Sequence, residues 1–434
     1  MRRSTLTLLL TAGLAVPGGA QTPLRLSVAD AMGKAREHHP QLARVRSERR
    51  IREADVRGSM ATYLPIVSTD WSLVRTDDPV AVFGSKLRQG KFAATDLALD
   101  ALNQPAAISN AAWGLTVEQP LVAPEGWFGR RAAQAGAEAG RLAESRAGQM
   151  VAFDALRAYF GAVFQTARIG VLDTALVAAR ETLRQVQSLR REGVVTAVDE
   201  QLAVARVSEL EAGRAMAEAD RIGALDQLLV TLGEAPGQLV ELTDRLELLA
   251  TEPDSGRRAD LDALRRVVAA QEANLKRVRA QRLPTAGAFG TVAFNDGSLA
   301  AVSGPAHWTA GVMVRWTPFK GLRDLAQADQ ARAERDRSVE ELSSAERAAD
   351  AEVRAAEARL AAARAALAAA ERALDYSAQA ARIAATRYAG GVATISELLA
   401  VRAGEAAQRL ARLEALFHAR IAQAHVAVAR GGNP

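Results

Sequence analysis

The pattern of apolar and polar positions along the chain predicts very long helices separated by short strands. No proline occurs from Gly126 to Glu192 or from Leu322 to Ala389, and apolar residues recur there every three to four positions. At the α-helical rise per residue, each run would form a helix roughly 100 Å long. Helices of that length are typical of coiled coils and rods. The spacing of Leu176, Ala179 and Leu183 indicates a seam against a neighbouring helix.

Four short runs alternate apolar and polar residues with the period of two that strands produce. They lie at about residues 66–75, 111–119, 285–295 and 307–317, and the third run alternates least regularly. Tryptophans occur in or beside three of the runs, at Trp71, Trp113, Trp308 and Trp316. Tryptophans so placed suit the aromatic girdle where a membrane barrel meets water. The same alternation also fits a half-buried soluble sheet.

The chain contains the same structural unit twice. Residues 189–199 align with residues 387–397 at a constant offset of 198. Two glycines, two threonines and two acids coincide in this alignment: Gly193 with Gly391, Thr196 with Thr394, and Asp199 with Glu397. Each copy reads as helix, strand, loop, strand, very long helix, glycine turn and helix. We therefore divide the chain into a first repeat at 21–233, a linker at 234–256 and a second repeat at 257–434, with turns near 193 and 391.

The first twenty residues have the composition of a secretory signal. Arg2 and Arg3 form a basic start, an apolar core runs from Leu6 to Val16, and small residues at 18–20 form a cleavage site. The apolar core is too short to span a bilayer. We therefore expect residues 1–20 to be a signal peptide that is removed on export.

Charge and cysteine content narrow the classes of protein further. The formal net charge is +5, and the basic residues are spread along the chain. This does not indicate the clustered basic surface of a nucleic-acid-binding protein. The absence of cysteine excludes disulfides, thiolate metal sites and a lipidated N-terminal cysteine. No segment after the signal has the roughly twenty apolar residues of a membrane helix, whereas the strands of a barrel need only about ten alternating residues each. Membrane attachment would therefore come from the strands.

No combination of residues indicates catalysis, a cofactor or a metal site. The segment Gly84–Lys91 resembles a phosphate loop, but it is one residue too long and Phe92 follows where Ser or Thr is needed. His418 and His425 are seven residues apart on a predicted helix, too far to share one ion. A first helix is predicted from Ser27 to Tyr63, and the run 38–40, His-His-Pro, is interpreted as a surface feature of that helix. We predict that the protein is not an enzyme and that it does not bind nucleotide.

A duplicated unit of this kind resembles the TolC-like outer-membrane efflux protein family. The most specific motif is Arg387-Tyr388-x-x-Gly391-x-x-Thr394-x-x-Glu397-Leu398-Leu399, which resembles the family's periplasmic helix-turn-helix signature. The resemblance covers essentially the whole mature chain. It implies a mostly α protein with a β-barrel portion: a trimeric channel-tunnel with four strands per chain in a shared twelve-stranded barrel and long coiled-coil helices in the periplasm. Residues 77–110 would form its extracellular loop.

Physical reasoning supports an oligomer independently of the resemblance. Four strands cannot close a barrel, and open sheet edges are not tolerated in lipid. Three copies would supply twelve strands and two copies would supply eight, so the strand count by itself leaves a dimer open.

The resemblance also assigns site residues. In this family the two glycine turns contact a periplasmic adaptor, which places docking at Gly193, Thr196, Gly391 and Thr394. It places Glu397 and Asp199 at the periplasmic aperture of the pore, without a second acid three residues further on. An ordinary helix-hairpin turn and solvated helix acids are the alternatives. The family often has an apolar residue just before the turn glycine, whereas this chain has Glu192 or Gly390.

The function implied is that of a passive outer-membrane exit duct extending into the periplasm. It would be a homotrimer in outer-membrane lipid, docked to a periplasmic adaptor and through it to an inner-membrane transporter, and would export small molecules or metal ions. A duct for type I protein secretion is an alternative. A periplasmic coiled-coil adaptor or structural protein is an alternative of a different class, although two tryptophan-bearing hairpins do not fit it.

Overall fold

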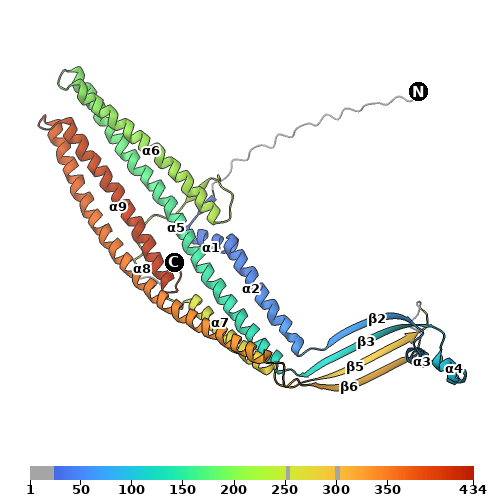
Figure 1. Cartoon of the computed structure of the whole chain (residues 1–434). Helices are drawn as coiled ribbons and strands as arrows, with labels where there is room; N and C mark the ends of the chain where they lie inside the picture. Colours follow the sequence, from blue (N-terminus) through green and yellow to red (C-terminus); the bar gives the residue numbers. More distant parts are fainter. Residues whose placement is uncertain (1–23, 251–254, 299–303) are drawn as a thin grey trace, which may run out of the picture. The chain divides into compact units, whose positions relative to one another are not determined.

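Helices account for most of the chain in the computed structural model, which describes residues 24–250, 255–298 and 304–434 (Figure 1). The predicted signal peptide lies outside the described residues. Two compact units are distinguished by their internal contacts. Unit 1 comprises the chain up to Ala43 together with Gly148–Arg257 and Glu352–Pro434, and unit 2 comprises Arg44–Ala147 and Arg258–Ala351.

Unit 2 contains a four-stranded antiparallel sheet. Its strands lie in the order β2-β3-β5-β6, with the bounds β2 (Ile66–Thr76), β3 (Ile108–Val122), β5 (Thr285–Asp296) and β6 (Ala306–Arg315). The four runs with strand-like alternation thus come together in one sheet. The edge strands β2 and β6 each pair on one side only within the described chain. A single copy therefore leaves this sheet open at both edges.

The sheet has one apolar face and one polar face. Trp71 pairs with Trp113, which pairs in turn with Phe294, so three aromatic residues form one row. The ring centroids of Trp113 and Phe294 are 5.6 Å apart. On the other face, the hydroxyls of Thr116 and Thr291 are hydrogen-bonded at 3.2 Å. This division is the one that a barrel wall between lipid and water requires.

Helices pack beside one another in unit 2. They are α2 (Pro40–Gly58), the short η1 (Ser59–Thr62), α7 (Ala259–Ala280) and the first parts of α5 (Pro124–Arg191) and α8 (Arg323–Ala389). Leu275 and Val278 of α7 are buried against Ala328 and Ala331 of α8. The small alanine side chains allow these two helices to approach closely.

Unit 1 contains the paired ends of the long helices. Its elements are α1 (Val28–His38), the second parts of α5 and α8, α6 (Ala197–Thr231), α9 (Ile395–Ala429), and a parallel pair of short strands, β1 (Leu24–Leu26) and β4 (Val240–Leu242). Leu176 and Ala179 of α5 are buried against Val207 and Leu210 of α6, with Leu183 packed beside them. The predicted helix–helix seam is therefore confirmed.

The first helix is shorter than its sequence pattern indicates. A single helix is expected from Ser27 to Tyr63, but α1 ends at His38 and α2 begins at Pro40. His39 between them is extended, with φ −63° and ψ 126°. Proline disfavours the helical conformation in the preceding residue and has no N–H to donate. The His-His-Pro run is thus a break between two helices.

The segment predicted as an extracellular loop, residues 77–110, contains helices. They are α3 (Pro79–Arg88), the short η2 (Ala94–Leu97) and α4 (Leu99–Asn103). Asp78 caps α3 by accepting a hydrogen bond from the Ala81 N–H at 2.8 Å, and Pro79 occupies the first turn. Asp followed by Pro is a strong helix start, and this signal is present in the sequence. The segment Gly84–Lys91 lies largely within α3, so it is no phosphate loop.

One described helix, α5, has an 18-residue window that is apolar enough to cross a membrane by length and composition. This helix is an exception to the expectation that no segment after the signal is apolar enough for a membrane helix. Leu156 and Tyr159 of this helix are fully buried in unit 1, where the Tyr159 hydroxyl donates to the Leu26 carbonyl at 3.0 Å. Of the apolar window itself, 28% is buried within the structure.

Candidate functional site

The turns at Gly193 and Gly391 have the same geometry. Gly193 has φ +75° and Gly391 has φ +74°. After each glycine a valine N–H reaches back to the helix end: Val194 donates to the Leu189 carbonyl and Val392 to the Arg387 carbonyl, both at 2.9 Å. This is a Schellman cap, which requires one residue in the left-handed backbone conformation. Glycine adopts that conformation without strain. The internal repeat thus reflects one turn structure used twice.

The space around the two turn glycines is open. A Cβ atom added at Gly193 or Gly391 would meet no atom of the chain within 4 Å. Val194 and Val392, which follow the glycines, are both 67% exposed. These valines occupy equivalent positions in the repeat, but the sequence pattern assigned them no role. Each turn therefore presents an apolar side chain to its surroundings.

Thr196 and Thr394 begin the two helices that follow the turns. The Thr196 hydroxyl accepts from the Asp199 N–H at 3.3 Å, and the Asp199 carboxylate accepts from the Thr196 N–H at 2.8 Å, completing a capping box. The Thr394 hydroxyl accepts from the Glu397 N–H at 3.2 Å, but no return bond is formed. Both threonines therefore cap the helices that follow the turns.

The caps give a direct prediction for local stability. Thr394→Ala should lower the free energy of opening the first turn of α9 by about 1 kcal/mol. The backbone amides of that turn should then exchange roughly five times faster. Thr196→Ala should have the larger effect, because Asp199 also loses its partner. Hydrogen-exchange mass spectrometry measures both, with Thr394→Ser and Thr196→Ser as controls that keep the hydroxyl. Unchanged exchange in both alanine variants would contradict the capping role.

The two predicted aperture acids have different partners. The Asp199 carboxylate is held by Thr196, whose hydroxyl donates to it at 2.8 Å. Glu397 instead forms an ion pair with Arg387, with Oε1 and Nη1 2.8 Å apart and both side chains about half exposed. Arg387 lies in the predicted motif, but the motif by itself assigned it no role. If several copies of the chain place Glu397 around a pore, each glutamate would therefore have an Arg387 beside it.

Tyr388 is a second residue of the motif whose surroundings could not be predicted from the sequence. Its hydroxyl is buried and makes no hydrogen bond with the described residues. Burial, and secondly the negative charge of Asp199, raise the pKa of Tyr388. The side chain packs on a cluster that joins α5, α6, α8 and α9 through buried Val186, Ala203, Ala384, Ile395 and Leu398. Tyr388 thus lies where the two helical hairpins of unit 1 meet.

The predicted interface tryptophans lie on or beside the sheet of unit 2. Trp71 is 57% exposed and Trp308 is 78% exposed, whereas Trp113 is covered in part by its neighbours. Trp316 follows the last residue of β6, at the opposite end of that strand from Trp308, and its Nε1 donates to the Arg282 carbonyl at 3.0 Å. Aromatic residues therefore lie toward both ends of the apolar face.

The other candidate chemistry is not assembled in the part of the chain that the structure describes. No group of three or more His, Asp or Glu side chains there could hold a metal ion. His418 Nε2 lies 3.6 Å from Glu414 Oε1, and the His425 ring is tilted by 36° against the Phe153 ring, with centroids 5.6 Å apart. The two histidines thus have separate surroundings.

Comparisons with known proteins identify the fold. Residues 255–432 match the protein family described as outer membrane efflux protein. No curated protein matches the chain in sequence.

Solved structures resemble the chain over nearly its whole length. One is a membrane protein from Pseudomonas aeruginosa, with 19% identity, a TM-score of 0.79, and coverage of 93% of this chain and 92% of that one. Another is the CmeC outer membrane channel of Campylobacter jejuni, with 16% identity, a TM-score of 0.77, and coverage of 93% and 85%.

A third is the open state of the MtrE outer membrane channel of Neisseria gonorrhoeae, with 18% identity, a TM-score of 0.78, and coverage of 93% and 89%. The helices, the four-stranded sheet and the two equivalent turns of this chain agree with such a fold. Residues 255–432 thus match the outer membrane efflux protein family, and the chain as a whole has a TolC-like channel-tunnel fold.

Proposed function

We propose that this protein is the outer-membrane exit duct of a tripartite export system, a passive channel for small molecules or metal ions. The observation that carries the proposal is the sheet of unit 2. It has an apolar, tryptophan-bearing face, a polar face and two edges that one copy leaves unpaired. Unpaired edges are not tolerated in lipid, so copies of the chain must join edge to edge.

Three copies give the assembly that best satisfies this requirement. They supply twelve strands, and the apolar faces then form a continuous outer surface toward lipid while the polar faces line a channel. The CmeC and MtrE proteins, which share the fold, are outer membrane channels. The long helices α5 and α8, with α6 and α9, form the periplasmic tunnel.

The two turns at Gly193 and Gly391 are the docking points for a periplasmic adaptor. They end the paired helices of unit 1, and each exposes a valine, Val194 or Val392, beside a glycine with free space around it. An apolar side chain at a narrow turn is suited to packing into a helical hairpin of a partner. The adaptor in turn connects the duct to an inner-membrane transporter, which supplies the energy.

Cell fractionation tests the location that this proposal requires. The protein should appear in the outer-membrane fraction and should resist extraction by salt, because its apolar face contacts lipid. A protein found only in the soluble periplasmic fraction would contradict the proposed function and favour a periplasmic adaptor or structural rod.

A further inference from the structure

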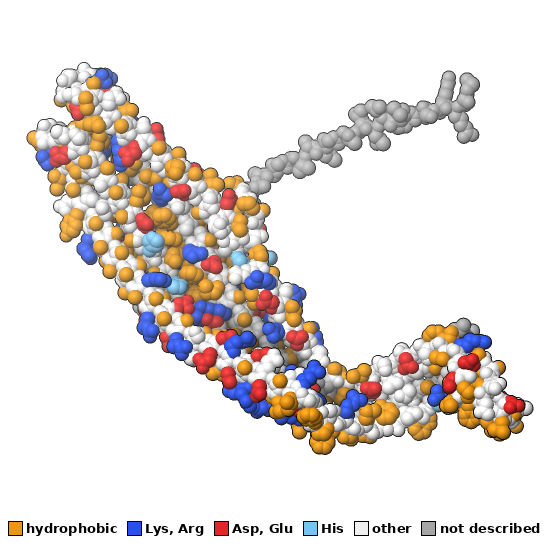
Figure 2. All heavy atoms as spheres, in the orientation of Figure 1, with side chains coloured by type: hydrophobic (Ala, Val, Ile, Leu, Met, Phe, Trp, Pro, Cys, Tyr) orange, Lys and Arg blue, Asp and Glu red, His pale blue; other side chains and the backbone are white. Residues whose placement is uncertain are grey.

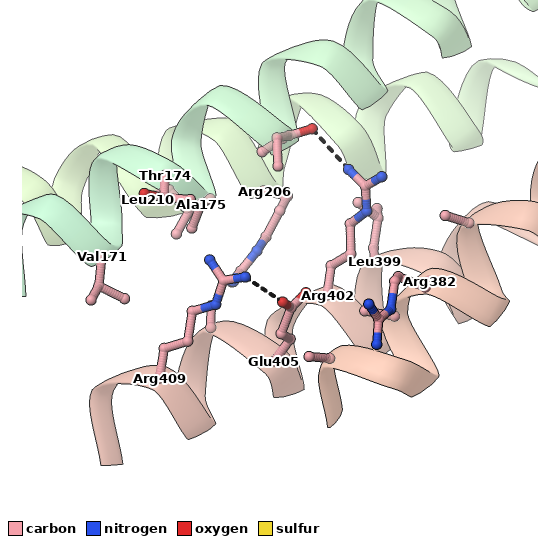
Figure 3. A pocket seen from close by; sticks show the side chains of 16 residues that line it. Val171, Thr174, Ala175, Arg206, Leu210, Arg382, Leu399, Arg402, Glu405 and Arg409 are labelled. Atoms are coloured by element: carbon pink, nitrogen blue, oxygen red, sulfur yellow. Dashed lines mark hydrogen bonds and ion pairs between the residues drawn. The ribbon is translucent and has the colours of Figure 1, made fainter. Parts of the chain in front are cut away.

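Unit 1 has an open cavity between its two helical hairpins (Figure 3). Its volume is about 390 Å³, and it is bounded by α5, α6, α8 and α9. Much of the wall is apolar, formed by alanines of α5 and α8 together with Val171, Leu210 and Leu399. Cavities of about 300–1,000 Å³ with apolar walls and a few polar groups are typical of sites for organic molecules.

The polar groups of this cavity are strongly biased toward positive charge. Four arginines line it, Arg206 from α6, Arg382 from α8, and Arg402 and Arg409 from α9. The only acid among the lining residues is Glu405. Figure 3 shows Arg206 entering from one hairpin and Arg402 and Arg409 from the other. Arginine is charged at every physiological pH, so the excess is permanent.

Carboxylates compensate only two of the four guanidinium groups. Arg409 pairs with Glu405 at 2.5 Å, and Arg206 pairs with Glu209 at 2.6 Å. The Nη1 atom of Arg402 donates to two neutral acceptors, the Ala178 carbonyl at 3.0 Å and the Thr182 hydroxyl at 2.8 Å.

Arg382 is the fourth arginine that lines the cavity. Neither Arg382 nor Arg402 forms an ion pair with any residue that the structure describes. Two guanidinium groups without a carboxylate therefore face one partly apolar cavity.

From this arrangement we infer that the cavity is a binding site for an amphipathic organic anion. Its sulfonate, carboxylate or phosphate group is held by Arg382, because a guanidinium matches the geometry of such oxyanions. Its apolar body lies against Val171, Leu210 and the alanines. The cavity is far larger than a water molecule, which occupies about 30 Å³ in the liquid, so a simple inorganic anion would leave most of it unfilled.

Calorimetric titration of the purified full-length protein in lipid nanodiscs tests the inference. The probe is naphthalene sulfonate, and empty nanodiscs provide the background. Two comparison probes separate charge from apolar contact: inorganic sulfate and a naphthyl trimethylammonium cation. The sulfonate should bind at least about tenfold more tightly than either, since each comparison probe lacks one of the two interactions.

Variants locate the binding. Arg382→Gln should weaken the affinity about fivefold to tenfold by removing one charge-assisted contact, and Ala378→Leu should weaken it by filling the cavity while keeping all four arginines. Arg372→Gln is the matched control, because Arg372 is an exposed arginine of α8 outside the lining. Arg402→Gln is less informative, because Arg402 also holds α9 against α5.

Equal affinity for the sulfonate and the cation would overturn the inference, as would an affinity unchanged by both Arg382→Gln and Ala378→Leu. The site does not depend on the proposed export function. Its failure would leave outer-membrane location and channel formation as they are.

Discussion

Replacing Gly391 with tryptophan is expected to abolish export while the protein still assembles in the outer membrane. Gly391 has φ +74° and open space where a side chain would project. An indole there would stand beside exposed Val392, where the adaptor is proposed to pack. The sheet of unit 2 lies in a different part of the chain, so barrel formation should not depend on this residue. Export and outer-membrane abundance are measured in the same cells.

Two matched variants separate the possible causes of such a loss. Gly391→Ala introduces the same backbone strain at positive φ, of about 1 kcal/mol, without the bulk of the indole, and should retain most of the export. Gly404→Trp adds the same bulk at an exposed glycine of α9 that lies away from the turn. Normal export by a well-assembled Gly391→Trp protein would show that the turn is only a structural turn.

Opposite changes in ion selectivity are expected when the two partners of the Arg387–Glu397 pair are removed separately. Their charges lie 2.8 Å apart in each copy, so a ring of three pairs has almost no net charge. Glu397→Ala leaves three arginines, which should lower the ratio of cation to anion permeability. Arg387→Ala leaves three carboxylates, which should raise that ratio and strengthen block by a trivalent cation. Charges focused in a narrow opening create potentials far above those of one exposed group.

Single-channel recording in planar bilayers measures both effects. The double variant, which lacks both charges, should resemble the parent, and Asp199→Ala should change selectivity less because Asp199 serves its own capping box. The shifts should shrink at high salt, since exposed charges are screened. Identical selectivity in the parent, Glu397→Ala and Arg387→Ala would place this pair away from the conducting path.

Much of the fold could be predicted from local pattern. The absence of proline predicts α5 and α8 almost to their ends, and the period-two alternation finds the strands of the sheet. The prediction from local pattern was wrong where one or two residues start or end a helix inside a longer stretch of different character. Pro40 lay within an otherwise helical pattern, and the Asp78-Pro79 start of α3 lay within a polar region read as loop. The three-residue strands β1 and β4 are too short to show any period.

Only those residues of the candidate site that occur in both copies of the repeat could be predicted from the sequence. Gly193, Thr196 and their counterparts stand out because the same turn occurs twice. The partner of Glu397 depends on how Arg387 folds back across the turn, and the buried position of Tyr388 depends on four helices meeting. The cavity with its unpaired arginines likewise exists only once residues from all four helices come together. Such features need tertiary structure.

The central claim is that several copies of this chain close one barrel in the outer membrane. The native mass of the protein extracted from that membrane tests it most directly. A particle of three mature chains is predicted, because three copies pair every edge formed by β2 and β6 and supply twelve strands. A monomer that is stable and soluble without detergent would contradict the account, since its apolar sheet face and both sheet edges would then have no lipid and no partner.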